Sequence, residues 1–526
     1  MDTYTNPEEY TYVTGITKFF LMPTDSGGIP AVAVSKGASV YISGAYTILI
    51  ILIFMIGWDL ILAIIMAFWP PSSKHSQTPL AALWGSGGSM SATMLLGSYC
   101  KRGILGNPKE GSMKWKSEDL PWGLPFVFIA LVLALGNAAA GVLVPAQLAM
   151  GNVVPPAKDV IFYPDVAHLT RTDDGGAGNA ILDSLKAPSA LRALGAIEVS
   201  EATAHKRVNI DKMRLIYDYN VTGVDMGLQS DPKLKLMVKG SCRTDDTWLL
   251  NSTDQGDTYR LFGGNDTLVV KYQPEVGLPP MVNFQIDPNT GGGSNVSYAM
   301  IVNTGGHYSY TSGQDPWYAT NKTVNGSVPY QVRRGRPALS CWEAKTWHLN
   351  GKEVDGSKLD TLPGLKLHKL WASTVFPIEF RDPRVVSVGK AAGLFALKSA
   401  SYTSVPSFIL DAGASAIDND LERLVLASWV SSRNFLRDTT TYINRGDIPN
   451  LLQGPGGSVE ASTAKFVLPS GDVVTFSVRV LISVPAILLF LFIVQMIFDC
   501  VPQPSKSGRK PTPLAGEKDE AASPGT

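Results

Sequence analysis

Three long apolar stretches constrain what this chain can fold into more than any other feature. They run from about Tyr46 to Trp69, from Trp122 to about Met150 and from Val480 to Phe498, and Asp59 is the one charged residue within them. An α-helix rises about 1.5 Å per residue, so about 20 apolar residues cross the roughly 30 Å hydrocarbon layer of a bilayer. The sequence therefore predicts three transmembrane helices. The charged fraction of 17% fits this prediction, because average soluble domains contain about 25%.

A fourth uncharged stretch runs from Pro79 to Tyr99, but glycines and serines dilute it. Such a segment buries little apolar area, so we expect it to rest at the membrane interface or to re-enter on the cytosolic side. The alternative, a full span, stays open and would move the N-terminus into the cytosol.

The distribution of basic residues predicts the orientation. Met1–Tyr41 contains two lysines and four acids, whereas Pro70–Leu120 contains six basic residues, and the tail after Cys500 also begins with basic residues. Basic residues concentrate in cytosolic segments, so we place the loop and the tail in the cytosol. The first 40 residues lack the pattern of a cleavable signal peptide, so the first helix is expected to direct insertion.

Glycosylation signals agree with this orientation. The motif N-x-Ser/Thr occurs six times, and every copy lies between Met150 and Arg479. Because this motif is the acceptor for N-glycosylation in exported segments, six copies confined to one region favour an extracytoplasmic location. The predicted glycosylation sites are Asn220, Asn251, Asn265, Asn295, Asn321 and Asn325.

The four cysteines divide between the two sides of the membrane. Cys242 and Cys341 fall in the exported region, where oxidation is permitted, so we predict that they form a disulfide, with two buried free thiols as the alternative. Cys500 directly follows the third apolar stretch, which is typical of an S-acylated cysteine, although an unmodified thiol fits equally well.

The exported region reads as a β-rich domain with a helical C-terminal part. Short alternating or β-branched runs such as Arg214–Tyr219 and Ser297–Val302 predict strands, and Asn350-Gly351 between two such runs predicts a hairpin. Asp418–Arg437 carries apolar residues at helical spacing, with Asp418 as the expected N-cap. The predicted fold class is thus an α+β membrane protein with three transmembrane helices and a large β-rich extracytoplasmic domain.

We divide the chain into seven segments on this basis. In chain order they are an extracytoplasmic N-terminal segment (1–41), the first helix (42–69), a cytosolic loop with its re-entrant or interfacial segment (70–120, with 79–99), the second helix (121–150), the glycosylated domain (151–475), the third helix (476–500) and a disordered cytosolic tail (501–526).

No sequence motif predicts catalysis or a cofactor. The chain has no phosphate-binding loop, no zinc-protease motif, no calcium-binding loop and no hydrolase nucleophile motif. Its six histidines show no metal-ligand spacing, so we predict no catalytic residue, no metal and no cofactor. A formal net charge of zero argues against a nucleic-acid partner.

Asp59 and Asn137 are the polar residues expected inside the membrane. A charge at this depth costs several kcal/mol unless it is neutralised or paired, so it should face protein or water. We predict a hydrogen bond between the two side chains that joins the first two helices, aided by small residues beside Asn137. An ion or proton pathway and a partner subunit are the alternatives.

Aromatic residues from His307 to Tyr318 form a second candidate feature. Exposed aromatics can stack on sugars or on partner proteins, so Tyr308, Tyr310, Trp317 and Tyr318 are candidates for facing a ligand. The alternative is that they pack in the β core.

Two strings carry a resemblance, Pro121-Trp-Gly-Leu-Pro125 before the second helix and Leu339-Ser-Cys-Trp-Glu343 in the exported domain. With the overall layout, they make the chain similar to uncharacterised multi-pass membrane proteins of filamentous fungi. This resemblance implies membrane insertion but transfers no activity.

The function expected from the sequence is recognition or an accessory role at a membrane surface. The expected partners are the lipid bilayer, a glycan or protein ligand of the exported domain, and a second copy of the chain. The plasma membrane or the secretory pathway is the expected location. A membrane-tethered ecto-enzyme acting on glycans or lipids is the alternative, and a transporter subunit is the third.

Overall fold

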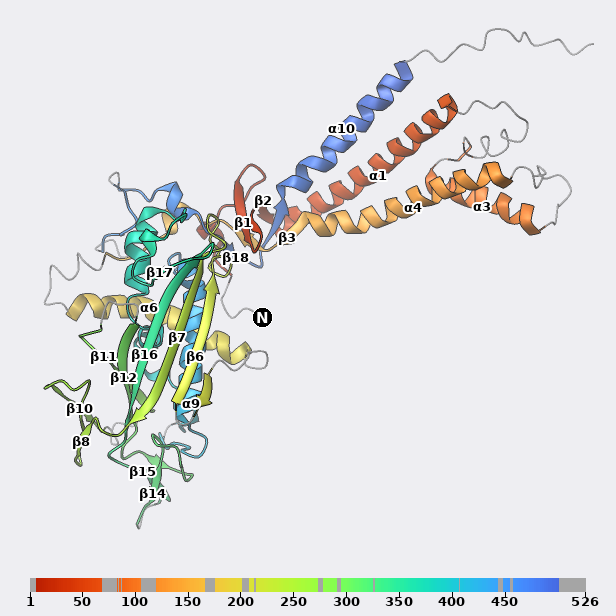
Figure 1. Ribbon diagram of the computed structural model, residues 1–526. Coiled ribbons are helices and arrows are strands. Elements are labelled where there is room, and N and C mark those ends of the chain that lie inside the picture. The colour runs from red at the N-terminus through yellow and green to blue at the C-terminus, as the bar shows by residue number, and fades with distance from the viewer. Residues whose placement is uncertain are drawn as a thin grey trace, which may run out of the picture. The chain divides into compact units, whose positions relative to one another are not determined.

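The three apolar stretches form helices α1 (Lys36–Phe68), α4 (Leu120–Leu148) and α10 (Val478–Cys500). Lys36–Ile65, Leu124–Leu148 and Val478–Phe498 are long and apolar enough to cross a membrane. Their large apolar side chains are widely exposed, for example Phe128 and Phe490, as expected for helices surrounded by lipid. The prediction of three apolar helices is therefore confirmed (Figure 1).

The structure is a computed structural model. It describes residues 6–68, 83, 85–86, 88–105, 120–165, 176–200, 208–211, 214–272, 278–290, 295–324, 327–405, 407–442, 448–454 and 457–500. The chain forms two compact units. The β-rich unit is Met1–Ser39 with Ala149–Val478, and the helical unit is Val40–Leu148 with Arg479–Thr526.

Among the described residues, helix α3 (Ser89–Leu105) is a further helix of the helical unit. Its Ala92 and Leu96 are buried in a cluster with Trp58 of α1 and with Phe126 and Ala130 of α4. Its 17 residues, which include Lys101 and Arg102, do not make it one of the three candidate spans among the described residues. Part of the ambiguous Pro79–Tyr99 stretch lies outside the described residues, so α3 accounts for its second half only.

The predicted contact between Asp59 and Asn137 is not formed. Asp59 is exposed, and among the described residues no hydrogen bond joins it to Asn137. The ring of Phe54 packs over Gly136 instead, 3.4 Å from where a β-carbon would lie. The prediction failed because rise per residue fixes the depth of a side chain but not the face of the helix on which it lies.

A four-stranded sheet brings together distant parts of the chain. Its order is β1 (Phe19–Thr24), β2 (Gly27–Ser35), β19 (Val473–Ser477) and β3 (Ala149–Gly151). Helix α1 begins directly after β2, α4 ends directly before β3, and α10 begins directly after β19. Each of the three apolar helices is therefore continuous with a strand of one sheet.

The largest sheet has seven antiparallel strands. Its strand order is β11 (Met281–Ile286), β12 (Asn295–Asn303), β16 (Ala338–Leu349), β7 (Lys235–Asp245), β6 (Arg214–Thr222) and β5 (Val208–Asp211), and β17 (Lys352–Asp355) also pairs with β16. Asn350 and Gly351, between β16 and β17, have φ of 51° and 79°, as the predicted hairpin turn requires.

A layer of helices packs on one face of this sheet. It consists of α6 (Gly176–Ser200), α8 (Arg384–Ala392) and α9 (Ile417–Asp438) (Figure 1). Helix α9 starts at Ile417 with Ala416 as its N-cap, so the predicted helix is present and its N-cap lies two residues before Asp418. The predicted α+β class with a large β-rich region is confirmed.

Smaller elements make up the rest of the described part of the β-rich unit. The remaining strands are β4 (Val153–Val154), β8 (Leu249–Ser252), β9 (Gly256–Arg260), β10 (Thr267–Lys271), β13 (Tyr308–Ser309), β14 (Thr320–Lys322), β15 (Tyr330–Val332) and β18 (Leu468–Pro469). The short helices are η1 (Glu9–Thr11), η3 (Lys158–Val160), η4 (Leu359–Thr361), η5 (Trp371–Val375), α7 (Phe376–Glu379), η6 (Gly393–Phe395), η7 (Lys398–Tyr402) and η8 (Ala461–Ala464).

Alternation along β16 turns two charged residues toward the core. Cys341, Glu343, Lys345 and Trp347 share the buried face, because side chains two residues apart point the same way. Lys345 Nζ lies 3.7 Å from Glu343 Oε1 and 2.6 Å from the carbonyl oxygen of Asp382. Burial lowers the pKa of Lys345 from 10.5 to about 8.

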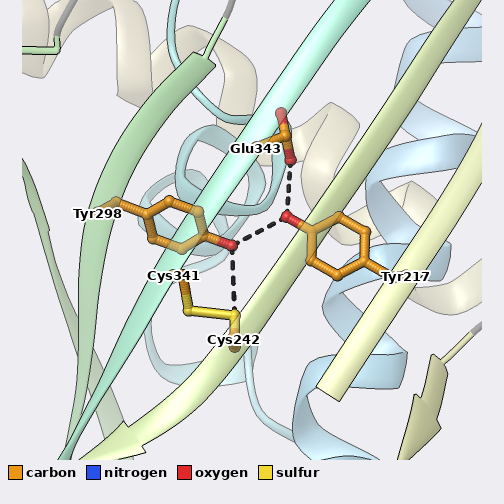
Figure 2. Close-up of a disulfide and its surroundings, with 5 residues drawn as sticks. All are labelled: Tyr217, Cys242, Tyr298, Cys341 and Glu343. Carbon is orange, nitrogen blue, oxygen red and sulfur yellow. Dashed lines mark hydrogen bonds between the residues drawn. A yellow bond between two sulfur atoms is a disulfide. The ribbon is translucent and has the colours of Figure 1, made fainter. Parts of the chain in front are cut away.

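The predicted disulfide between Cys242 and Cys341 is present and joins facing residues of β7 and β16. Beside the disulfide, two hydrogen bonds run from the Tyr298 hydroxyl through the Tyr217 hydroxyl to Glu343 (Figure 2). The Tyr298 hydroxyl lies 3.8 Å from Cys242 Sγ and 3.0 Å from the Tyr217 hydroxyl, which donates to Glu343 Oε2 at 3.0 Å. The buried carboxylate of Glu343 is thus paired with neighbouring polar groups on several sides.

Gly240 makes the Tyr217–Glu343 hydrogen bond geometrically feasible. In the sheet register Gly240 lies directly between Tyr217 and Glu343. A β-carbon on Gly240 would lie 2.1 Å from the Tyr217 ring, so a side chain there is sterically excluded.

We therefore expect Gly240→Ala to lower the free energy of unfolding by about 2–5 kcal/mol, through overpacking and loss of the Tyr217–Glu343 hydrogen bond. Thermal unfolding of the full-length protein in nanodiscs measures the effect. Gly264→Ala is the matched control, because the nearest contact of a β-carbon there is an ordinary 3.5 Å from the Leu261 carbonyl oxygen. Equal midpoints for the two variants would contradict this account of the core.

Candidate ligand-binding cleft

A cleft of about 690 Å³ lies in the β-rich unit, within the range of about 300–1,000 Å³ that holds small-molecule ligands. Five separate parts of the chain line it, namely the N-terminal segment with η1, the segment around η3, helix α6, the end of α9, and the loop after Asn450. The lining residues are Asn6, Pro7, Glu8, Tyr10, Thr11, Asp159, Val160, Ile161, Phe162, Arg192, Arg437, Thr440, Thr441, Tyr442, Asn450, Gln453, Gly457, Ser458 and Val459.

The end of α9 forms one wall because three threonines terminate the helix. The hydroxyls of Thr439, Thr440 and Thr441 each donate to the carbonyl oxygen three residues earlier, at 2.6, 2.8 and 2.9 Å. These bonds satisfy carbonyl groups that a helix end leaves without partners. The backbone amide of Phe162 donates to the Thr439 carbonyl oxygen at 2.9 Å, which attaches the second wall to the first.

Asn450 fixes the third wall through its side chain. Its Oδ1 accepts from the amides of Tyr163 and Leu452, both at 3.1 Å, and its Nδ2 donates to the Ile161 carbonyl oxygen at 2.8 Å. Asn450 is 9% exposed, and its side-chain amide makes hydrogen bonds to the backbone of the protein itself. Its role at the cleft is therefore structural.

The N-terminal segment forms the fourth wall and is tied to the rest of the β-rich unit. The amide of Gly471 donates to Asn6 Oδ1 at 2.9 Å, and the amide of Ala157 donates to the Thr11 carbonyl oxygen at 2.9 Å. Tyr10 is 70% exposed at the rim of the cleft.

Arg192 provides a compensated positive charge in the lining. Its Nη2 lies 3.0 Å from Asp438 Oδ1 and 2.9 Å from Thr441 Oγ1. Asp438 is buried, and burial raises its pKa from 3.8 to about 6 although Arg192 and Arg437 act in the opposite direction. The acids Glu8 and Asp159 also line the cleft, so its charges are balanced.

A buried ion-pair network lies beneath the cleft, and Tyr442 lines both the cleft and a cavity of about 20 Å³ beside this network. Glu379 Oε1 accepts from Arg384 Nη1 at 2.5 Å, and its Oε2 lies 2.6 Å from Lys186 Nζ and 3.0 Å from the Tyr163 hydroxyl. Burial alone would raise the pKa of Glu379, but Lys186 and Arg384 outweigh burial and lower it from 4.5 to about 2.

Only two of the four aromatic residues predicted to face a ligand are exposed. Tyr308 and Tyr310 are 47% and 52% exposed, whereas Trp317 and Tyr318 are 1% and 0% exposed. Trp317 and Tyr318 belong to the main hydrophobic core, and the Tyr318 hydroxyl donates to Asp420 Oδ2 at 2.5 Å. The prediction that these two residues face a ligand is wrong, because they attach their loop to the N-terminal end of α9.

The other predicted site residues lie mostly at the surface. The sequon asparagines Asn220, Asn251, Asn265, Asn295 and Asn321 are exposed, and Asn325 lies outside the described residues. Cys500 ends α10 and is exposed, so it is accessible to acylation. Among the described residues no group of three or more His, Cys, Asp or Glu side chains is placed to hold a metal ion.

Sequence patterns did not reveal the cleft residues Arg192, Arg437 and Tyr442 or the buried charges of the core. The sequence did contain a signal for two of the buried charges. Glu343 and Lys345 alternate with the same spacing as Cys341 and Trp347, so all four side chains point to the same face of the strand. No local sequence pattern indicates the cleft, since residues as far apart in the chain as Asn6 and Ser458 line it.

Glu379→Gln should destabilise the protein. The substitution keeps the shape of the side chain but leaves the cations of Arg384 and Lys186 without their carboxylate, so we expect the free energy of unfolding to fall by about 3–5 kcal/mol. Thermal unfolding of the full-length protein in nanodiscs measures it. Asp254→Asn is the control, because this exposed carboxylate pairs with Arg334 at the surface and its loss should leave the midpoint unchanged.

The effect should also depend on pH. Since the pKa of Glu379 is lower in the folded than in the unfolded state, its ion pairs stabilise fully above about pH 4.5, and this stabilisation is lost as the pH falls toward about 2. We expect the midpoint difference between wild type and Glu379→Gln to shrink over that range. A difference that stays constant would contradict the ion-pair account.

Comparison with known proteins gives one match. A family model described as "Domain of unknown function (DUF8406)" matches residues 187–468, more than half of the chain. These residues contain the seven-stranded sheet, α8 and α9, but not the apolar helices or the N-terminal strands. No curated protein and no solved structure matches the chain. The resemblance to membrane proteins of filamentous fungi therefore stays a prediction. The chain belongs to the DUF8406 family.

Proposed function

We propose that this protein is an integral membrane protein that displays a glycosylated β-rich unit on the extracytoplasmic side, in the plasma membrane or the secretory pathway, and acts there by recognition. One observation carries the proposal: three helices able to cross a membrane are each directly adjacent in the chain to a strand of the same four-stranded sheet. Such a sheet gathers the membrane entry and exit points of the chain at one place in the β-rich unit.

The same sheet supports a topology. β2 precedes α1, whereas β3 follows α4, and both pair with β19. A hydrogen-bonded sheet cannot be divided by a bilayer, so the chain between β2 and β3 must cross an even number of times. Helices α1 and α4 supply two crossings, which favours a Pro79–Tyr99 segment that stays on one side.

Charge and surface features support the sidedness. The Pro70–Leu120 loop is rich in basic residues and fits the cytosol. The five described sequon asparagines are exposed in the β-rich unit, where an oligosaccharide can be attached without disturbing the core.

The cleft supports recognition over catalysis. Its walls are fixed by hydrogen bonds between distant segments, as preformed ligand sites require. A general acid would need a raised pKa together with access to substrate, whereas Asp438, the acid next to the cleft whose pKa is raised, is buried and paired with Arg192. We therefore place the ecto-enzyme second.

The topology predicts which parts of the chain are accessible from outside intact cells. An epitope tag before Met1 and the Asn220 glycan should both be accessible to antibody and glycosidase, while a tag after Thr526 should be protected until the membrane is permeabilised. Asn220→Gln should remove one glycan and increase electrophoretic mobility, and Asn283→Gln, which lies outside any sequon, is the matched control.

Protection of the N-terminal tag in cells whose β-rich unit is accessible would contradict the topology, because it would require an odd number of crossings before β3. Accessibility of both termini without permeabilisation would equally contradict it.

A further inference from the structure

We propose that the cleft binds a neutral carbohydrate, a short oligosaccharide, an inference that rests on the recognition function proposed above. A pyranose ring carries hydroxyl groups around its edge and C–H groups on its faces. A site for it therefore needs hydrogen-bonding side chains together with an aromatic surface, and it does not need a net charge.

The cleft offers hydrogen-bonding groups that the protein leaves available. Gln453 and Ser458 line it and are exposed, and among the described residues neither side chain makes a hydrogen bond. An amide supplies two donors and an acceptor, and a hydroxyl supplies one donor and two lone pairs. Two such groups on one wall match neighbouring hydroxyls of a sugar.

Aromatic surface is present at the rim. Tyr10 lines the cleft and is 70% exposed, so its ring face is accessible, and Tyr442 lies deeper in the lining. A tyrosine combines a flat apolar face with a polar hydroxyl, which suits a ligand that is itself apolar on its faces and polar at its edge.

Charge balance argues against an anionic ligand. Arg192 is already paired with Asp438, and Glu8 and Asp159 face the same space as Arg192 and Arg437. A phosphate or a uronate would meet acids as well as cations, whereas a neutral sugar meets no such penalty. The many polar groups of the lining likewise disfavour a lipid chain, whose burial there would leave them without partners.

Binding to the full-length protein in nanodiscs tests the proposal. The probes are neutral hexasaccharides of glucose, mannose and N-acetylglucosamine, with inorganic phosphate and a polygalacturonate oligomer as anionic comparisons. Calorimetry should detect a neutral saccharide that binds more tightly than either anion.

Two variants test whether the saccharide binds in the cleft. Tyr10→Ala removes the exposed ring and should weaken saccharide binding about tenfold, and Ser458→Trp fills the cleft from an exposed position and should abolish binding. Tyr310→Ala is the matched control, since this tyrosine is 52% exposed and does not line the cleft. Equal unfolding midpoints of all three variants verify that they fold.

The other outcomes overturn the proposal in distinguishable ways. Saccharide binding that survives both cleft variants would place recognition elsewhere on the protein. Tighter binding of phosphate or polygalacturonate than of every neutral sugar would overturn the ligand class and keep the cleft. Binding of no probe would overturn the carbohydrate inference. The proposed membrane topology is tested separately, by the epitope-tag and glycosidase experiment.

Discussion

The pairing of β2 with β19 is the interaction on which the rest of the structure depends. It joins residues 31–35 to residues 473–477, so that the start of the chain and the end of the β-rich unit share one sheet. β3 adds the beginning of the Ala149–Val478 segment to the other edge of β19. Every apolar helix is thereby continuous with a strand whose position is fixed by backbone hydrogen bonds. The N-terminal segment that this sheet secures also forms one wall of the cleft, which links the anchoring of the chain to the candidate site.

The core of the β-rich unit contains charged groups where apolar side chains would be simpler. Glu343, Lys345, Glu379 and Arg384 are each at most 4% exposed. Removing one partner of a buried pair destabilises strongly, whereas replacing the whole pair by apolar residues is often neutral. A buried network of this kind is therefore weak evidence for net stability, although each of its charges depends on its partners. Here these charged groups join strand β16 to α7 and α8 and thus fix the helical layer on which one wall of the cleft is built.

Features encoded by local pattern could be predicted from the sequence. The apolar helices, strands such as β6 and β12, and the Asn350-Gly351 hairpin follow from runs of neighbouring residues. Strands β1 and β2 were not predicted, because Pro23, Pro30 and paired glycines interrupt their pattern and the partner strand β19 lies more than 400 residues away.

The errors at the candidate sites have the same origin. Whether Trp317 stacks on a ligand or fills the core depends on α9 and on the loop before it, about 100 residues further along the chain. Likewise the face of α1 that carries Asp59 is set by contacts such as Phe54 on Gly136, which no spacing rule contains. The cleft depends on five distant segments at once, so it could be recognised only in three dimensions.

Cysteine cross-linking in native membranes tests the central pairing most directly. Val34 and Val474 face each other in the register of β2 and β19, so cysteines at both positions should form a disulfide that mass spectrometry detects in unreduced peptides. The single variants Val34→Cys and Val474→Cys should give no such cross-linked peptide. Efficient cross-linking in the double variant would show that the chain before α1 and the chain before α10 lie on the same side of the membrane, as proposed. A double variant that stays reduced under oxidising conditions, in protein that otherwise retains the Cys242–Cys341 disulfide, would contradict the account.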